Sequence, residues 1–479
     1  MQMIQFIGRK KEFADLQLLL KKMVASFVVV RGRRRIGKSR LIEEFGKSAR
    51  FLEFTGLPPT KGTTAKKQRQ EFMRQFKENC GYSSLDVDDW GDIFSLLAKE
   101  TATGRVIILL DEISWMGSKD STFLGKLKIA WDIHFKKNSQ LILIICGSVS
   151  SWIEKNILSH TGFVGRISRA ILLEELSLPD CKKLLETMGC RYPHEEFFKL
   201  LGVTGGIPRY LEEIQRGMGV DENIKRICFC SDGLLFREFD QLFSDLFSKK
   251  KETYKKVVQL LANQEMETQE VANHLGYSRS GYVSNILNDL VKAGFLKVTY
   301  AWDLQTQKEK KKPRFRLTDN YLRFYLKYIE PNRGRIEKGH FDQQSLTAFP
   351  GWAAMMGLQF ENLVIHNSEY VFNSLYLSRE DILFDNPYLQ RQTSTQQGCQ
   401  IDYLIQTRYR MLFACEIKFS RQPLTLTVVE EMKQKIKRLK LPRGFAINPV
   451  LIYLNGVSDS VIDANYFTHL IDFSEILKS

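Results

Sequence analysis

The sequence predicts a multidomain α/β protein, and three observations lead to this fold class. Phe27–Val30 is a short apolar run of the kind found in buried parallel strands, and a loop containing two glycines follows it closely. A second apolar run ends in the acidic pair Asp111-Glu112. In the last third of the chain, Gln400–Ile405 and Met411–Lys418 alternate like strands. Helical periodicity separates these runs, so several α/β modules are expected in one chain.

The composition is that of a globular protein with substantial hydrophobic cores. The chain has 479 residues, of which 43% are hydrophobic and 26% charged, and this length suits roughly three domains. Lys and Arg number 70 against 55 Asp and Glu, which gives a formal net charge of +15. Such a surface attracts polyanions, chiefly nucleic acid or anionic membrane, although basicity spread evenly over a surface is the alternative.

The cysteine pattern and the first residues of the sequence indicate the cellular compartment. None of the 8 cysteines forms a CxxC pair, and no histidine lies at zinc-ligand spacing from them, so they are expected to be buried free thiols in a reducing cytoplasm. The first residues lack the apolar core of a signal peptide, and the longest apolar runs are far too short to span a bilayer. We therefore expect a cytoplasmic protein with no membrane partner.

The first candidate site is the loop after Phe27–Val30. Gly32-Arg33-Arg34-Arg35-Ile36-Gly37-Lys38-Ser39 matches G-x-x-x-x-G-K-S, and a helical pattern starts at Arg40. The glycines let the backbone curl so that its N–H groups face phosphate oxygens, Lys38 supplies charge to the β and γ phosphates, and the Ser39 hydroxyl ligates Mg²⁺. The strand before the loop and the helix after it support a P-loop, and so predict ATP and Mg²⁺ as ligands.

Three later polar positions could complete this site. Asp111 would hold the Mg²⁺ shell and Glu112 would orient and deprotonate the attacking water, unless the pair only caps the next segment. Ser148, after the apolar run Leu141–Cys146, could sense the γ-phosphate or cap a helix. Arg166, in a loop after Gly165, could neutralise transition-state charge or be a surface cation.

A family resemblance enters with motifs that occur in a fixed order. They are Phe6-Ile7-Gly8-Arg9, Gly32–Ser39, Leu109–Glu112, Gly147-Ser148, Gly165-Arg166 and Gly205-Gly206-Ile207-Pro208-Arg209-Tyr210. Together they resemble the archaeal-type ATPases related to the AAA+ and STAND groups, over essentially the whole chain. The resemblance implies a helical lid over 171–245 and a nucleotide contact by Pro208. It also implies that Ile7-Gly8-Arg9 lies near the adenine. The alternative for Gly205-Gly206 is a simple turn before a helix.

The middle of the chain predicts a winged helix-turn-helix. Thr268–Leu275 indicates one helix, and a second follows with an exposed face that includes Arg279 and Asn285. Phe295–Ala301 and Arg314–Leu317 can pair as a hairpin around a lysine-rich tip at Lys308–Lys312. In such a module the second helix enters the major groove and Lys311 in the tip lies along phosphates. Alternatively the module is a spacer or docking surface with a solvated tip.

The last domain carries a set of carboxylates. Asp402 lies on one predicted strand, and the period of two puts Glu416 and Lys418 on one face of the next. Asp followed by Glu-x-Lys resembles the PD-(D/E)xK nucleases, which implies that Asp402 and Glu416 hold Mg²⁺, that Lys418 activates water, and that Glu361 is an outer carboxylate on a helix. An inactive domain of this fold, or a stray ion pair, is the alternative.

Two further segments complete the interpretation of the C-terminal half. The segment that opens with Asp319–Tyr325 resembles the DUF234-type region found after such ATPases, and Pro331-Asn332-Arg333-Gly334 is the expected linker. Lys435 and neighbouring basic residues on the helix Thr427–Leu439 are expected to face a phosphate backbone or water.

The full expectation is a P-loop NTPase core over 1–170, a helical lid over 171–245, a winged helix-turn-helix over 246–330 and a restriction-endonuclease-like α/β domain over 331–479. The function expected from this order is ATP binding and hydrolysis coupled to action on DNA, with a Mg²⁺-dependent nuclease at the C-terminal end and a homo-oligomer as one assembly. The alternatives are a STAND-like nucleotide switch or a transcription regulator with a non-catalytic nuclease-like domain.

Overall fold

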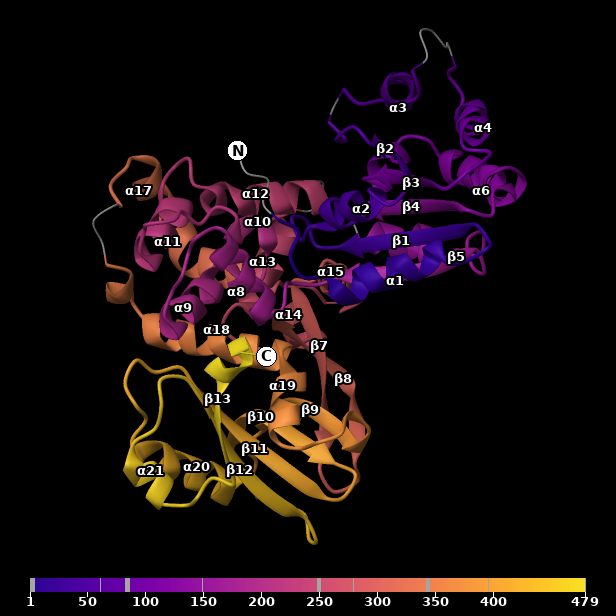
Figure 1. Cartoon of the computed structure of the whole chain (residues 1–479). Helices are drawn as coiled ribbons and strands as arrows, with labels where there is room; N and C mark the ends of the chain where they lie inside the picture. Colours follow the sequence, from indigo (N-terminus) through magenta and orange to yellow (C-terminus); the bar gives the residue numbers. More distant parts are fainter. Residues whose placement is uncertain are drawn as a thin grey trace. The chain divides into compact units, whose positions relative to one another are not determined.

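The computed structural model describes residues 5–60, 62–81, 87–148, 150–247, 251–278, 280–341, 345–394 and 396–478. The chain forms two compact units (Figure 1). The first comprises Met1–Leu176 with Lys292–Gly294, and the second comprises Ser177–Val291 with Phe295–Ser479. No helix among the described residues is long and apolar enough to cross a membrane. All 8 cysteines are free thiols.

The first unit is built on a five-stranded parallel sheet of order β2-β3-β4-β1-β5. Apolar runs form the central strands because both faces of a parallel sheet are covered by helices. The predicted strands at 27–30 and 141–146 and the run before Asp111 are confirmed. The strands are β1 (Ser26–Gly32), β2 (Arg50–Thr55), β3 (Val106–Asp111), β4 (Leu141–Gly147) and β5 (Ile167–Leu173).

Helices cover this sheet, and side chains such as Phe54, Trp90 and Phe123 form the core beneath them. The first group comprises α1 (Lys10–Leu20), α2 (Lys38–Gly46), α3 (Ala65–Cys80), α4 (Trp90–Glu100) and α5 (Ile113–Met116). The second comprises α6 (Phe123–Ile133), the 3₁₀ turn Phe135–Lys137, α7 (Ser150–Ile153) and the π-helical turn Glu154–Leu158.

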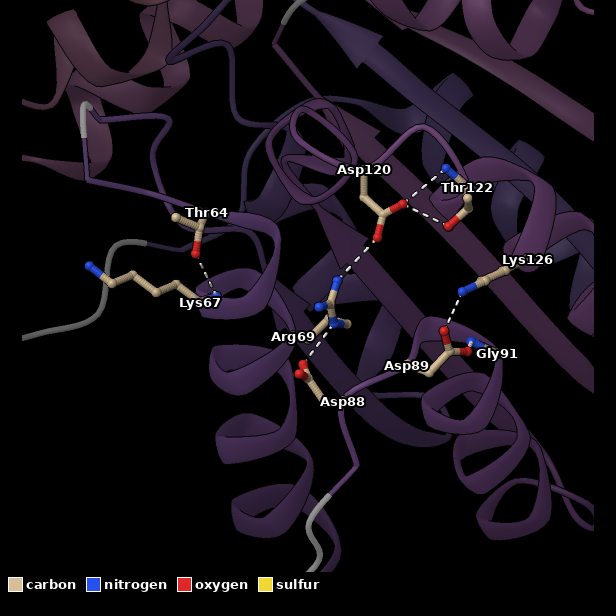
Figure 2. A network of polar contacts seen from close by, with 9 residues as sticks. All are labelled: Thr64, Lys67, Arg69, Asp88, Asp89, Gly91, Asp120, Thr122 and Lys126. Carbon is tan, nitrogen blue, oxygen red and sulfur yellow. Dashed lines mark hydrogen bonds and ion pairs between the residues drawn. The ribbon is translucent and has the colours of Figure 1, made fainter.

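A polar network fastens the helices inserted between β2 and β3 (Figure 2). Arg69 on α3 donates to Asp88 at 2.9 Å and to Asp120 at 3.1 Å. Asp89 accepts from the backbone N–H of Gly91 at 2.7 Å, which caps α4, and it also pairs with Lys126 on α6. These bonds hold α3, the start of α4 and α6 in one arrangement beside the sheet.

The second unit opens with helices and a small antiparallel sheet of order β6-β8-β7. The helices are α8 (Leu178–Thr187), α9 (His194–Thr204), α10 (Pro208–Leu211), α11 (Val220–Phe229), α12 (Leu234–Phe247) and α13 (Lys251–Leu261). Then follow β6 (Met266–Glu267), α14 (Thr268–His274), α15 (Ser280–Lys292), β7 (Leu296–Asp303) and β8 (Lys308–Leu317). The helix, turn, helix and hairpin that the sequence predicts within 246–330 correspond to α14, α15, β7 and β8, whereas α13 and β6 were not predicted.

The hairpin tip differs from the prediction. The lysine run Lys308–Lys312 lies inside β8, and the tip is the shorter segment 304–307, because Asp303 pairs with Lys308 at the end of the ladder. Trp302 and Leu304 are buried, with exposed fractions of 1% and 4%, in the core of the C-terminal sheet. The end of the hairpin is therefore anchored to the C-terminal sheet by Trp302. Strand pairing between β7 and β8 continues past the lysines to Asp303 and Lys308.

The C-terminal half of this unit contains a mixed sheet of order β13-β12-β11-β10-β9, in which β12 runs parallel to β11 and β13, and β10 runs antiparallel to its neighbours. Its strands are β9 (Ile382–Gln390), β10 (Cys399–Thr407), β11 (Met411–Lys418), β12 (Ala446–Tyr453) and β13 (His469–Asp472). Its helices are α16 (Asn320–Phe324), α17 (Arg333–Glu337), α18 (Trp352–His366), α19 (Ser368–Ser374), α20 (Thr427–Arg438) and α21 (Asp459–Asp463). Short turns lie at Tyr325–Ile329, Glu330–Asn332, Leu346–Ala348, Arg379–Asp381 and Phe473–Lys478.

Buried polar contacts join the segments assigned to three separate domains. Gln359 on α18 donates to the carbonyls of Gly202 on α9, at 2.8 Å, and of Asn320 on α16, at 2.6 Å. Arg323 donates to Gln359 at 2.7 Å. The expected linker at 331–334 is also wrong, because it is helical and Arg333 pairs with Asp240 at 2.6 Å. The segments predicted as lid, winged helix and C-terminal domain thus belong to one compact unit.

Candidate functional site

The loop after β1 has the backbone geometry of a phosphate cradle. Gly32 has φ 150° and Gly37 has φ 90°, values that L side chains rarely adopt. The side chain of Lys38 folds back so that Nζ donates to the carbonyl oxygens of Gly32, at 3.1 Å, and Arg33, at 3.0 Å. A Cβ on Gly32 would lie 2.4 Å from the carbonyl oxygen of Leu173, so β5 also requires glycine there.

The remaining loop residues are held by packing and by a brace. Ile36 is buried, Arg33 is largely buried, and Arg35 has φ 67°. Arg9 donates from Nη2 to the Ile36 carbonyl oxygen at 2.9 Å, which ties the N-terminal segment to the loop. Arg34 is half-buried, and Arg40 on α2 lies 3.7 Å from Glu43. The resemblance implied that Arg9 lies near the adenine, which stays a prediction; in the structure its bond to the Ile36 carbonyl supports the loop.

Two oxygen groups meet beside the cradle. Ser39 Oγ donates to Asp111 Oδ2 at 2.7 Å, although the residues are far apart in sequence. The second oxygen, Oδ1, accepts from the backbone N–H of Glu112 at 2.9 Å, which orients the carboxylate. A hydroxyl and a carboxylate are hard oxygen donors that suit Mg²⁺, which binds through few protein ligands and substrate phosphates. These two residues therefore fit the metal that the loop implies.

Glu112 lies beyond Asp111 and is held by Ser148. Its backbone is left-handed, with φ 48°. Ser148 Oγ lies 3.1 Å from Glu112 Oε1, and the Ser148 N–H donates to Oε2 at 3.3 Å. Burial raises the pKa of Glu112, and the positive charge of Lys38 opposes that shift. Ser148 thus contacts the candidate general base directly, a contact the sequence could not reveal.

The structure does not place Arg166 beside the loop, where the sequence suggested that it could neutralise transition-state charge. Ile167, the next residue, pairs with Phe27 at the start of β1, whereas the phosphate loop follows the end of β1 at Gly32. Arg166 therefore lies at the opposite edge of the parallel sheet. There it forms a two-pronged ion pair with Asp132 on α6, at 2.9 Å for both bonds. A lone Gly-Arg loop carries no information about which sheet edge it occupies.

Pro208 belongs to the second unit, where it begins the short helix α10 (Pro208–Leu211). It is half-exposed beside the buried Ile207. Its role as a nucleotide contact stays a prediction.

Comparison with known proteins agrees with this geometry. Residues 6–214 match the family model described as an ATPase domain predominantly from Archaea. The N-terminal part of the chain is therefore similar to that ATPase domain. The match extends past the first unit through α8, α9 and α10. The uncharacterized protein MJECL04 of Methanocaldococcus jannaschii is 27% identical over 361 residues, which span 75% of this chain and 76% of that protein.

Solved structures show weaker likeness. The Walker-type ATPase PABY2304 of Pyrococcus abyssi is 15% identical, covers 67% of this chain and 96% of that chain, and has a TM-score of 0.49. The ORC2 protein of Aeropyrum pernix, in ADPNP–ADP complexes, is 14% identical with a TM-score of 0.40, over 70% of this chain and 96% of that one. Likeness at this level says nothing about what the present chain binds.

A second cluster lies in the C-terminal sheet. Asp402 on β10 accepts from the backbone N–H of Ile417 at 3.0 Å, which brings it beside β11. Glu416 is 1% exposed, and Lys418 Nζ lies 3.0 Å from its Oε1. Lys418 also pairs with Glu431 on α20 at 2.8 Å. The structure therefore brings together the three residues that the sequence grouped.

Lys435 is the member of this cluster that the sequence placed elsewhere. Its Nζ lies 2.6 Å from Glu416 and 3.3 Å from Asp402, instead of facing solvent or a backbone. It follows the buried Met432 by three residues on α20, so it borders the buried stripe of that helix. This spacing was the available signal, since residues three apart share a helix face.

Glu361 on α18 interacts electrostatically with Asp402 of the same cluster. Burial raises the pKa of Glu361 to about 7, the Asp402 charge adds to that rise, and Arg316 opposes it. Burial also raises the pKa of Glu416, with the same contribution from Asp402. For Lys418, the ion pairs with Glu431 and Glu416 outweigh the opposing effect of burial and raise the pKa.

The fit of this cluster to Mg²⁺ is partial. Asp402 and Glu416 supply two hard carboxylates, which suffice when substrate phosphate and water complete the coordination. However, the Lys435 ammonium lies between them and must move for a cation to bind both. Among the residues described above, no group of three or more His, Cys, Asp or Glu is arranged to hold a metal ion.

The predicted nucleic-acid contacts have mixed outcomes. Arg279 lies outside the described residues. Asn285 is exposed on α15, on the face opposite the buried residues Ile286 and Leu287. Lys311 is exposed on β8, away from the predicted tip. The structure thus presents Asn285 and Lys311 to solvent in different elements of the same module.

Proposed function

We propose that this chain binds ATP with Mg²⁺ at the P-loop and hydrolyses it. The observation that carries this proposal is the convergence of Lys38, Ser39, Asp111 and Glu112 at one edge of the sheet. A bound Mg²⁺ would neutralise charge on the triphosphate. Ser39 and Asp111 are the residues that would hold it, because their side-chain oxygens already lie 2.7 Å apart.

The chain's own groups divide the work of hydrolysis. Lys38 stabilises negative charge on the β and γ phosphates. Glu112 accepts a proton from the water that attacks the γ-phosphorus, and the bond to the β–γ bridging oxygen breaks to leave ADP and phosphate. Ser148 fixes the Glu112 carboxylate through two contacts. Burial raises the pKa of Glu112, which makes its carboxylate a better proton acceptor.

Nucleotide binding and turnover test this proposal separately. Lys38→Ala should abolish Mg²⁺-dependent binding of a fluorescent ATP analogue, whereas Glu112→Gln should retain binding and lose turnover. Lys47→Ala is a matched control, since Lys47 is an exposed lysine at the end of α2 that pairs only with Glu44 among the described residues. Absence of magnesium-dependent nucleotide affinity in the wild-type protein would overturn the proposal.

We propose further that ATP use is coupled to action on DNA. The net charge of +15 and the exposed Asn285 and Lys311 of the 246–330 module support nucleic acid as the partner. In this proposal 171–245 is the helical lid, with Pro208 on the nucleotide, and 246–330 is a winged helix. Coupling must be reciprocal, so ATP and DNA must change each other's affinity by the same factor. Equal DNA affinity with and without ATP would contradict it.

A second candidate function is a Mg²⁺-dependent nuclease at the C-terminal cluster. The observation that favours it is the convergence of Asp402, Glu416 and Lys418 across β10 and β11. Plasmid nicking with Mg²⁺ should be lost in Asp402→Ala and Lys418→Ala, while Lys437→Ala on the exposed face of α20 should nick normally. If wild type and both cluster variants nicked the plasmid at the same residual rate, the proposal of a nuclease would be refuted.

A non-catalytic role is the competing interpretation of the same cluster. The Lys435 ammonium already pairs with both Asp402 and Glu416, which suits a STAND-like switch or a transcription regulator that keeps the nuclease-like fold without cutting. Such a switch predicts tightly bound, slowly hydrolysed ATP and no nicking. A regulator predicts sequence-selective duplex binding that Asn285→Ala weakens.

A further inference from the structure

A cavity of about 580 Å³ separates the β7–β8 hairpin from the C-terminal sheet within the second unit. One wall is the hairpin, from Thr299 to Gln305 and from Lys310 to Arg314. The other wall is the end of β9 with the residues that follow it, together with Lys440–Pro442 after α20. Figure 1 shows β7 beside β9 in the lower part of the molecule, in agreement with the contacts between these two strands.

The charge of the cavity is strongly positive. Six cationic side chains line it against three carboxylates, Glu265, Glu267 and Asp303. Glu267 is already engaged by Arg391 at 3.0 Å, and Glu265 by Arg314 at 3.6 Å. Among the described residues, no carboxylate oxygen lies within 4.0 Å of Lys311 or Lys440, which face the cavity from opposite walls. The excess charge therefore comes from lysines that remain available to an anion.

Aromatic rings lie among these cations. Tyr300 is 38% exposed in the hairpin wall, and Tyr388 lines the opposite wall. Tyr388 is held edge-on against Trp302, with ring centroids 5.1 Å apart, so the aromatic surface is rigid. Trp302 is itself anchored by a 2.6 Å bond from Nε1 to Gln406. The walls are thus preorganised, and binding would not need to order the hairpin.

We propose that this cavity binds a single strand of nucleic acid, with phosphates on Lys311 and Lys440 and a base on Tyr300. A groove with cations for the backbone and aromatic faces for bases is the arrangement that binds single strands without sequence preference. The volume lies in the range of about 300–1,000 Å³ that holds one small ligand, which suits a short strand segment and not a duplex. The inference rests on the proposed action on DNA and names a site for the separated strand.

Fluorescence anisotropy with labelled oligo(dT) tests this site in the full-length protein. The double variant Lys311→Glu/Lys440→Glu should bind oligo(dT) about tenfold or more weakly, and its log affinity should fall less steeply with log salt, by about 0.7 per lost phosphate contact. Tyr300→Ala should weaken binding severalfold, and Tyr300→Phe should restore it. Lys137→Glu/Lys338→Glu changes the net charge equally on exposed lysines outside the cavity and should bind like wild type.

Three results would overturn the inference. The cavity variants could bind oligo(dT) as tightly as wild type, or the control double variant could lose as much affinity as they do. A loss of duplex affinity with unchanged oligo(dT) affinity would assign these lysines to duplex binding instead. If the wild-type protein bound neither oligo(dT) nor duplex, the proposed action on DNA would fall as well, whereas nucleotide binding by the P-loop is measured independently.

Discussion

Trp302→Ala is the substitution that tests whether the hairpin end is part of the C-terminal core. Trp302 is 1% exposed, stacks on Phe384 with ring centroids 5.3 Å apart, and donates to Gln406 at 2.6 Å. Truncating a buried tryptophan to alanine typically costs about 3–5 kcal/mol. The amide oxygen of Gln406 would also lose its donor, which adds about 1 kcal/mol or more if water cannot reach it. We therefore expect a loss near 4 kcal/mol in the stability of this module.

Hydrogen exchange is the suitable assay because a chain with two compact units does not unfold as one two-state system. The expected loss corresponds to about a thousandfold faster exchange of the amides in β10 and β11, since each 1.4 kcal/mol is about a factor of ten. Trp302→Phe should cost less, about 1–2 kcal/mol, because a phenyl ring keeps part of the packing while the N–H and the rest of the indole are lost. Lys308→Ala, exposed on the same hairpin, should stay within about 0.5 kcal/mol of wild type.

A small effect would refute the reasoning. If Trp302→Ala accelerated exchange in β10 and β11 by less than about tenfold, the hairpin end would contribute little to the core. The hairpin could then move independently, and the rigid cavity wall inferred from Trp302 would lose its support.

Three further predictions concern the two sites. Gly32→Ala should reduce nucleotide affinity and lower the melting temperature, because the added Cβ would lie 2.4 Å from a rigid backbone oxygen; unchanged melting would contradict this. Ser148→Ala should lower kcat about tenfold with unchanged nucleotide affinity, since one hydrogen bond to Glu112 is lost; an affinity change without a kcat change would refute positioning. Burial of Glu361 raises its pKa from 4.5 to about 7, so its protonated form is favoured in the fold and stability should fall as pH rises from about 4.5 to 7. In metal-free hydrogen-exchange measurements on the α18 amides, corrected for intrinsic exchange rates, Glu361→Gln should remove up to about 3 kcal/mol of that fall, whereas an identical pH profile would argue against the shift.

The candidate nucleotide site could be predicted because most of its residues lie close together in the sequence. The loop Gly32–Ser39 carries its ligands on consecutive residues, and the apolar run before Asp111 identifies a buried strand without any knowledge of its neighbours. Parallel strands end at one edge, so Asp111 was expected beside the loop, and Ser39 does lie 2.7 Å from it. The same periodicity placed Glu416 and Lys418 on one face of β11.

Only the tertiary structure decided the strand register, the edge of the sheet at which a loop lies, and the packing between segments that are distant in sequence. Arg166 lies at the far edge of the sheet because β5 begins opposite the start of β1. Lys435 enters the carboxylate cluster because α20 packs beside β10; its spacing from the buried Met432 indicates the inner face of α20, but not that this face meets Asp402 and Glu416. Trp302 joins a core built about a hundred residues later in the chain. A one-dimensional pattern shows which face of an element is apolar, whereas the partner of that face is selected only when the whole chain folds.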